Sequence, residues 1–216
     1  MKICVVGAHG NMGRRYCSIL RYFGHDVLEH DIGSMPEGVS KCDGIIIATP
    51  TDTHYDVMMY YEHFGIPMLV EKPITKSIEQ LIELMELKTT WRMINQYEYF
   101  EYQNQMKNPN ILSMFDGKPH TEYDFFKSGS DTILWDCINL IGLAKGTFKC
   151  ANMSPIWNCI LNGHKLDYSK IDYAYIWNIH DWLDRFDDNR LYALKAHEKV
   201  FEILKYKMED NLDDKL

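Results

Sequence analysis

Short apolar runs alternate with stretches of helical periodicity over the first hundred residues of the chain. Each run is bounded by glycine, proline or charged residues, which is typical of strands buried in a parallel sheet. Between the runs, apolar residues recur at helical spacing, and glycine or proline follows where a helix would end. The expected strands are residues 2–6, 25–31, 43–50, 68–73 and 91–96, and the expected helices follow residue 10, span 53–64 and follow Ser77.

The helix after Ser77 has the clearest start signal. Gln80 lies three residues after Ser77, which is the spacing of a capping box. Strands joined by helices of this length form right-handed crossover units and therefore a parallel sheet. The connection between the second and third strands is shorter, so we expect a short or irregular crossover there. The expected buried face of the helix after Ser77 consists of Ile78, Leu81, Ile82 and Met85.

The pattern changes after residue 97, where strand and helix signals no longer alternate. Asn162-Gly163 between two apolar runs favours a type I′ hairpin turn. The aromatic-rich run at 168–183 either lines a sugar site or belongs to the core. The expected elements of this part are a strand at 121–126, an apolar helix at 131–145, a hairpin at 157–168 and a terminal helix at 189–206.

Composition and charge narrow the classes of function. Hydrophobic residues make up 46% and charged residues 25% of the chain, which is ordinary for a globular protein. A net charge of −8 argues against sequence-independent binding of nucleic acid, and no apolar stretch is long enough to span a membrane. The cysteines and histidines lack metal-ligand spacing, and no signal peptide is apparent. We therefore expect a reduced, cytoplasmic protein without a metal site.

Three glycines directly follow the first expected strand in VVGAHGNMGRR, residues 5–15. Gly7, Gly10 and Gly13 have a G-x-x-G-x-x-G spacing, a variant of the dinucleotide-binding fingerprint. In such a loop the backbone can approach a pyrophosphate, whose charge meets the N–H groups at the helix start. By itself the loop fits a cofactor site and a structural turn equally well. His9 is off-pattern, and we assign it no chemistry.

An acidic residue follows the glycines at the distance expected for a ribose-binding carboxylate. Asp31 ends the second expected strand, and Glu29 is the fallback. A carboxylate there accepts hydrogen bonds from both ribose hydroxyls and repels a 2′-phosphate, which favours NAD over NADP. The alternative is that Asp31 merely ends a strand.

Two further motifs end the third and fourth expected strands. ATPTDTHYDV, residues 48–57, places hydroxyls and helix N–H donors at the carboxyl edge of the sheet, where open α/β sheets bind ligands. A turn with a helix N-cap would explain Thr51, Asp52 or Thr53, but not the EKP motif at the end of the next strand. Glu71-Lys72-Pro73 brings an ammonium group to the same edge, where it can hold a substrate hydroxyl or relay its proton. A solvated lysine before proline is the alternative, and the position on the sheet favours the site.

In these three stretches, and in their order and spacing, the chain resembles the Gfo/Idh/MocA (glucose–fructose oxidoreductase/inositol dehydrogenase) family. The resemblance covers most of residues 1–100. It implies a Rossmann NAD(P) domain, a second α/β domain whose sheet often forms oligomers, and chemistry at a hydroxyl–ketone carbon of sugars, cyclitols or nucleotide-linked sugars. A homodimer is therefore an expectation. The residues implied around the cofactor are Gly7, Gly10, Asn11, Met12, Gly13, Asp31, Thr49, Pro50, His54, Glu71, Lys72, Asn95 and Gln96.

The second part departs from the family pattern. Residues 128–146 resemble the family helix that carries a catalytic D-x-x-x-H pair, but only the aspartate, Asp136, is present. Asn139 is the nearest polar residue, and an asparagine can orient a hydroxyl but cannot take its proton. His180 is the alternative base, His197 is expected at the surface, and Asp136 has a structural carboxylate as its alternative. The expected catalytic residues are Lys72, Asp136 and Asn139.

We predict an α/β protein with a Rossmann-type parallel sheet at residues 1–100. A small α+β domain with a reduced sheet follows at 101–216, and its terminal helix packs back on the first domain. The expected function is NAD(H)-dependent transfer of hydride to or from a hydroxyl or ketone carbon of a sugar-like substrate. The alternative is an NAD(H)-binding regulator or scaffold that has lost catalysis, because the second domain is short and lacks the family histidine.

Overall fold

The computed structural model describes the sheet-forming half of the chain and two later helices. The expected strand at 121–126, Asp136 and most of the expected helix at 131–145 lie outside the described residues. The described residues are 1–31, 37–96, 98, 135, 138–139, 160–161, 164–165 and 171–213, with the backbone alone at 160–161, 164–165, 171 and 203–213.

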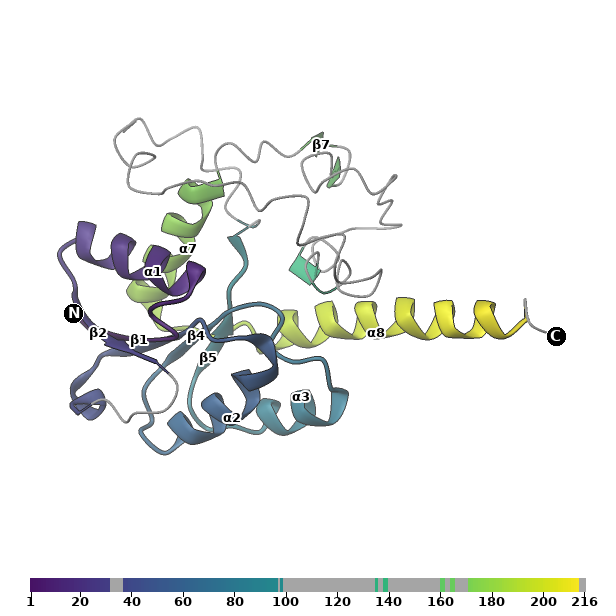
Figure 1. The fold of residues 1–216 in the computed structure, drawn as a ribbon, viewed down its shortest axis with the longest axis horizontal. Helices are drawn as coiled ribbons and strands as arrows, with labels where there is room; N and C mark the ends of the chain where they lie inside the picture. Colours follow the sequence, from purple (N-terminus) through teal and green to yellow (C-terminus); the bar gives the residue numbers. More distant parts are fainter. Residues whose placement is uncertain are drawn as a thin grey trace.

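Five strands form one parallel sheet in the order β2-β1-β3-β4-β5 (Figure 1). The chain runs from β1 outward to β2 and then crosses back to β3, so the order reverses between β1 and β3. Ligands bind at such a reversal in open α/β sheets. The predicted α/β class and parallel sheet are confirmed. The strands are β1 (Lys2–Val6), β2 (Asp26–His30), β3 (Gly44–Ile47), β4 (Met68–Val70) and β5 (Trp91–Met93).

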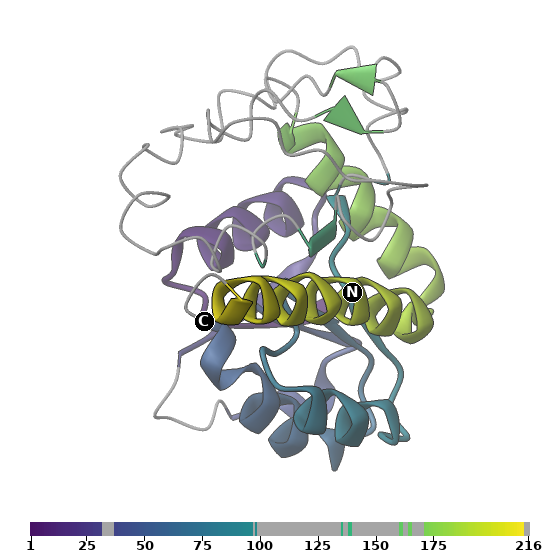
Figure 2. The ribbon, with the colours of Figure 1, turned by 90° about the vertical axis from the view of Figure 1, so that its right-hand side faces the viewer.

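Helices cover both faces of this sheet (Figure 2). One face packs against α1 (Asn11–Tyr22) and α7 (Ile171–Arg185). The other face packs against α2 (Thr51–Glu62), α3 (Ile78–Met85) and the first part of α8 (Arg190–Asp213), whose far end extends away from the sheet. In the described part of the connection between β2 and β3, for which a short or irregular crossover was predicted, lies a 3-10 turn, η1 (Val39–Lys41).

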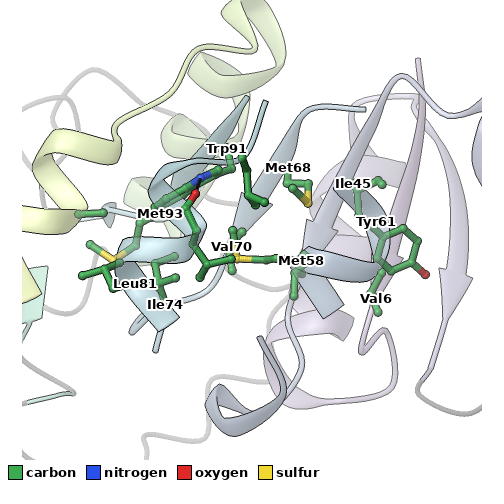
Figure 3. Packing of buried hydrophobic residues seen from close by; sticks show 14 of the residues in the cluster. Val6, Ile45, Met58, Tyr61, Met68, Val70, Ile74, Leu81, Trp91 and Met93 are labelled. Carbon is green, nitrogen blue, oxygen red and sulfur yellow. Dashed lines mark hydrogen bonds between the residues drawn. The ribbon is translucent and has the colours of Figure 1, made fainter. Parts of the chain in front are cut away.

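The alternation of side chains along the strands explains the two cores. Ile3 and Val5 of β1 face α1 and α7, while Cys4 and Val6 face α2 and α3, because successive strand residues point to opposite faces. Figure 3 shows the second of these cores, with Met58 and Tyr61 of α2 beside side chains of the sheet. All of β3 and β4 is buried, as a central parallel sheet requires.

The described part of the aromatic-rich run, from Ile171 on, forms α7 and packs in the core. Tyr173, Ile179 and Trp182 pack with β1 and α1 in one buried cluster. A Cβ on Gly44 would lie 2.7 Å from the ring of Trp182, so only glycine allows β3 to approach this helix so closely. Of the two interpretations left open by the sequence, core packing therefore holds for the described part of this run.

Two side chains at the start of α8 attach this helix to β5. Asn189 Nδ2 donates to the carbonyl of Met93 at 2.8 Å, and its Oδ1 accepts from the Met93 amide at 2.7 Å. The guanidinium of Arg190 donates to the carbonyls of Met85, Leu87 and Thr89. Residues at the start of α8 thus form hydrogen bonds with the α3–β5 turn and with the outer edge of β5. The helix begins one residue later than predicted and continues to Asp213.

The hairpin signal at Asn162-Gly163 is confirmed by two short antiparallel strands. These are β6 (Ile160–Leu161) and β7 (His164–Lys165), in which Leu161 pairs with His164.

The Ser77 cap is also confirmed, since its hydroxyl accepts from the Gln80 amide at 3.3 Å. None of the helices within the described ranges is long and apolar enough to cross a membrane.

Two expectations about burial are wrong. Ile82 is 56% exposed, because the buried stripe of α3 centres on Leu81 and Leu84, and one step of about 100° turns Ile82 away from it. His197 is fully buried rather than at the surface, because α8 lies against the sheet with Trp135 beside the imidazole.

Candidate cofactor site

Two glycines of the loop after β1 have no room for a side chain, Gly7 because of the end of β3 and Gly13 because of the loop itself. A Cβ on Gly7 would lie 2.7 Å from the carbonyl oxygen of Ala48, and Gly7 has φ +83°. A Cβ on Gly13 would lie 2.0 Å from the carbonyl oxygen of Gly7. Both glycines are therefore required to bring the start of α1 to the carboxyl edge of the sheet.

The N-terminus of α1 is open to an anion. Gly10 is its N-cap and provides no side-chain hydrogen bond, and the first turn contains no acidic residue. The first N–H groups of a helix have no partner within the helix, so those of Asn11, Met12 and Gly13 face outward from its start. Together with the helix dipole they favour a phosphate group at this position.

Two carboxylates stand at the end of β2, beside the glycine loop. The amides of Gly7 and Ala8 donate to the carbonyl of His30 at 2.8 and 3.1 Å, which ties the loop to this strand. Asp31 and Glu29 both lie within ion-pair distance of His9, at 2.6 and 3.5 Å. The predicted ribose-binding residue, Asp31, thus lies next to the predicted pyrophosphate loop.

At the end of β3, Thr49 is buried and Pro50 is exposed. His54, in the first turn of α2, contacts the backbone at this strand end. The two ring nitrogens of His54 lie 2.8 Å from the carbonyl of Thr49 and 2.9 Å from that of Pro73. A neutral imidazole can donate to only one of these carbonyls. Burial lowers the pKa of His54. Its ring is therefore occupied in joining the β3 and β4 ends.

The end of β4 carries Glu71 and Lys72, followed by a cis peptide bond to Pro73. Glu71 is buried and accepts hydrogen bonds from the hydroxyl of Tyr16 on α1 and from the amide of Lys72 at 3.0 Å. Glu71 thereby links the helix that follows the glycine loop to the turn that carries Lys72. Lys72 itself is half-buried at this edge.

At the end of β5, Asn95 and Gln96 are both buried. Within the described ranges, no group forms a hydrogen bond with Asn95 Oδ1, which leaves a buried acceptor at this edge. The amide of Asn139 donates to the carbonyl of Ile94 at 2.8 Å and to Gln96 Oε1 at 3.2 Å, while Tyr192 donates to the Asn139 carbonyl. Asn139 thus attaches its segment to β5.

The structure brings most of the predicted site residues to one edge of the sheet. The glycine loop, Asp31, Thr49, Lys72 and Gln96 all follow the carboxyl ends of parallel strands. Their assignment to a cofactor or to catalysis stays a prediction.

Two candidates from the second half of the chain are not part of this edge as described. Asp136 lies outside the described residues. His180 stacks edge-on against Phe23, the C-cap of α1, and so lies at the opposite end of that helix from the glycine loop.

Tyr16 on α1 is a residue of this edge that the sequence motifs do not indicate. It is fully buried, and burial together with Glu71 raises its pKa far above the usual value, so its hydroxyl stays protonated and donates. A tyrosine on the buried stripe of a helix needs a hydrogen-bond partner, and that requirement was the available signal.

The strand ends of β2 to β5 lie within a stretch that matches a known protein family. A family model described as "Oxidoreductase family, NAD-binding Rossmann fold" (GFO_IDH_MocA) matches residues 21–96. These residues run from the end of α1 to the end of β5. Over this stretch the chain is similar to the Gfo/Idh/MocA family. The match includes the ATPTDTH and EKP motifs and confirms the resemblance there, while the glycine motif precedes the matched residues.

Solved structures show the same Gfo/Idh/MocA fold over a longer stretch. A myo-inositol dehydrogenase from Corynebacterium glutamicum is 15% identical, with a TM-score of 0.62 over 95% of this chain and 96% of that one. The dehydrogenase MviM from Clostridium difficile is 14% identical, with a TM-score of 0.63 over 95% and 99%. At such identities the likeness shows the fold alone.

A third solved structure aligns over a shorter stretch. The WlbA (WbpB) dehydrogenase from Thermus thermophilus, in complex with NAD and UDP-GlcNAcA, is 18% identical with a TM-score of 0.38. The alignment covers 50% of this chain and 48% of that one, so it spans about half of that protein's length. Among curated proteins, no sequence match reached significance.

Proposed function

We propose that the chain is an NAD(H)-dependent oxidoreductase that acts on a hydroxyl or ketone carbon of a sugar, cyclitol or nucleotide-linked sugar. The observation that carries this proposal is the meeting of four strand ends at one edge of the sheet. The glycine loop follows β1, Asp31 follows β2, Thr49 follows β3 and Lys72 lies just beyond β4. The family of the Rossmann domain supports the reaction class.

The residues present fit a dinucleotide. The open start of α1 suits a pyrophosphate, and Asp31 beside it suits the hydroxyls of the adenosine ribose. A carboxylate at that position favours NAD over NADP. When bound, NAD(H) supplies the acceptor or donor of hydride.

Lys72 is proposed as the catalytic residue that binds the reacting oxygen of the substrate. An ammonium group can donate a hydrogen bond to that oxygen and stabilise negative charge on it as the carbon changes oxidation state. Asn95 Oδ1, which is buried at the same edge, is proposed to accept from a hydroxyl or amide of the bound molecules. Asp136 is proposed to share the proton transfer.

The substitution Lys72→Ala tests this role. We expect it to lower kcat by about 10²-fold or more on a substrate found among aldoses, cyclitols and nucleotide-linked sugars, while NAD binding is retained. Lys76→Ala is the matched control, because Lys76 is exposed four residues later and lies 3.7 Å from Asp52. Formation of NADH is the readout. Full turnover in Lys72→Ala would contradict the proposed role.

A second candidate function, an NAD(H)-binding regulator or scaffold, is favoured by the contacts of Asn139. Asn139, the polar residue nearest to the position of the missing family histidine, is fully buried, and its amide donates to Ile94 and Gln96. Such a group neither takes a proton nor faces solvent. Tight NAD(H) binding by calorimetry, combined with no turnover on the whole substrate panel, would favour this alternative over the oxidoreductase.

A further inference from the structure

His9 stands where the glycine loop meets the end of β2, and several contacts fix its position. Arg14 Nη1 donates to the His9 carbonyl at 2.6 Å, and the neighbouring Ala8 amide donates to the carbonyl of His30 at 3.1 Å. The imidazole extends toward the ends of the β2 side chains, with Nδ1 2.6 Å from Asp31 Oδ2 and Nε2 3.5 Å from Glu29 Oε2. The off-pattern residue of the loop is thus the direct neighbour of the candidate ribose carboxylate.

The two carboxylates have different neighbours. Glu29 Oε1 lies 2.6 Å from the guanidinium of Arg21 on α1, so a permanent positive charge accompanies Glu29. Asp31 has His9 as its nearest charged or titratable neighbour among the contacts of the described residues. Its effective charge therefore depends on whether His9 is protonated, and histidine is the side chain that changes charge between about pH 5 and 8.

The charge on Asp31 decides how a 2′-phosphate is received. An ionised, unpaired carboxylate accepts from the two ribose hydroxyls of NAD and repels the doubly charged 2′-phosphate of NADP. A protonated imidazole at 2.6 Å offsets that carboxylate and can itself donate to a phosphate oxygen. A neutral imidazole carries no charge to offset the carboxylate, and it has a single N–H, which Asp31 can accept at Nδ1.

We propose that His9 is a specificity-determining residue of the adenosine site, which sets the preference for NAD over NADP through its own protonation. Neutral His9 leaves Asp31 to reject the 2′-phosphate, and protonated His9 weakens that rejection. Among the described residues, Glu29 and Asp31 at the end of β2 face the His9 imidazole, and Arg14 of α1 donates to the His9 carbonyl. Arg21 of α1 is paired with Glu29, and the carbonyl of His30 accepts from the Ala8 amide. The inference rests on the proposed NAD(H)-binding function.

The test is the ratio of the dissociation constants of NADP and NAD, measured by calorimetry at low salt at about pH 5.5 and pH 8. Contributions common to both cofactors cancel in this ratio. The 2′-phosphate itself takes up a proton near pH 6, so a pH-dependent part remains in every variant. His9→Gln keeps a polar side chain of similar size without a titrating group and therefore measures that part alone.

In the wild-type chain we expect the ratio to fall between pH 8 and pH 5.5 by about three- to tenfold more than in His9→Gln. Asp31→Asn, with His9 intact, should have a lower ratio than the wild-type chain at pH 8, because the carboxylate that rejects the 2′-phosphate is gone; an unchanged ratio at pH 8 would contradict the role of Asp31. Equal pH dependence in wild type and His9→Gln would overturn the role of His9 while leaving cofactor binding established. Absence of binding of either cofactor at both pH values would overturn the proposed function itself, and this inference with it.

Discussion

A buried tyrosine holds the acidic residue of the EKP turn in place. The Tyr16 hydroxyl donates to Glu71, whose other oxygen accepts from the Lys72 amide. Both side chains are buried, so neither could exchange this contact for water. At the scale of single residues, the position of the proposed catalytic lysine thus depends on a side chain from α1, the helix that starts at the glycine loop.

We expect Tyr16→Phe to lower the free energy of unfolding by about 1–3 kcal/mol, because it leaves a buried carboxylate oxygen without its donor. Urea unfolding measures this change. Tyr22→Phe is the matched control, since Tyr22 lies on the same helix and is 43% exposed. Loss of its hydroxyl should change the free energy of unfolding little. Equal unfolding free energies for the two variants would show that the Tyr16–Glu71 contact contributes nothing.

At the scale of elements, the start of α8 closes the outer edge of the sheet. Arg190 donates to three carbonyls of the α3–β5 turn, and its guanidinium lies 5.6 Å from the centre of the Trp91 ring. The planar fork of an arginine reaches several acceptors at once, which a lysine cannot do.

Arg190→Ala should therefore lower the free energy of unfolding by about 2–3 kcal/mol, and Arg190→Lys should recover only a small part of the loss. Denaturant unfolding followed by tryptophan fluorescence is a suitable readout, because Trp91 is next to the substituted side chain. Arg185→Ala serves as control: Arg185 is 61% exposed, and its ion pair with Asp181 should be worth about 0–1 kcal/mol. Full recovery by lysine would contradict the role of the fork.

Sequence patterns predicted the elements of the sheet to within a few residues, because short apolar runs and helical spacing are local properties. They also predicted that the glycine loop, Asp31 and Lys72 follow the ends of strands at the carboxyl edge of the sheet, because turn residues and strand ends can be recognised in the sequence. The contacts of Tyr16 and Asn189 and the exposure of Ile82 were not predictable in this way. They depend on which helix lies against which strand, and that is set by tertiary packing.

At the scale of the whole molecule, buried histidines make stability depend on pH. His197 is fully buried on α8, and burial lowers its pKa to about 4, against about 6.5 for an exposed histidine. Between these values the unfolded chain binds a proton that the folded chain does not. Folding stability should therefore fall as the pH drops through this window, by up to about 3 kcal/mol from His197.

His197→Gln should flatten the dependence of unfolding free energy on pH between about 6.5 and 4, whatever its effect on stability at neutral pH. The comparison is with His63→Gln, which makes the same substitution at an exposed histidine. A slope in His197→Gln equal to that of the wild type would show that His197 does not resist protonation in the folded chain.

The open start of α1 is the feature on which the proposed function depends most. Asn11 is the first residue of α1, is exposed, and its Oδ1 accepts from Arg14 at 2.9 Å. Asn11→Asp keeps the size of the side chain and its contact with Arg14, and the negative charge interacts favourably with the helix dipole at the N-terminus of α1. The same charge should repel a pyrophosphate. Ser40→Asp, in η1 just before the amino end of β3, adds an equal charge at the opposite edge of the sheet.

The most direct measurement is therefore calorimetric titration of NAD into the full chain, the Asn11→Asp variant and the Ser40→Asp variant. We expect wild type and Ser40→Asp to bind with similar affinity, and Asn11→Asp to bind about tenfold or more weakly although its Tm is not lowered. No binding to the wild-type chain, or equal binding to the wild type and Asn11→Asp, would contradict the assignment of this sheet edge as a dinucleotide site.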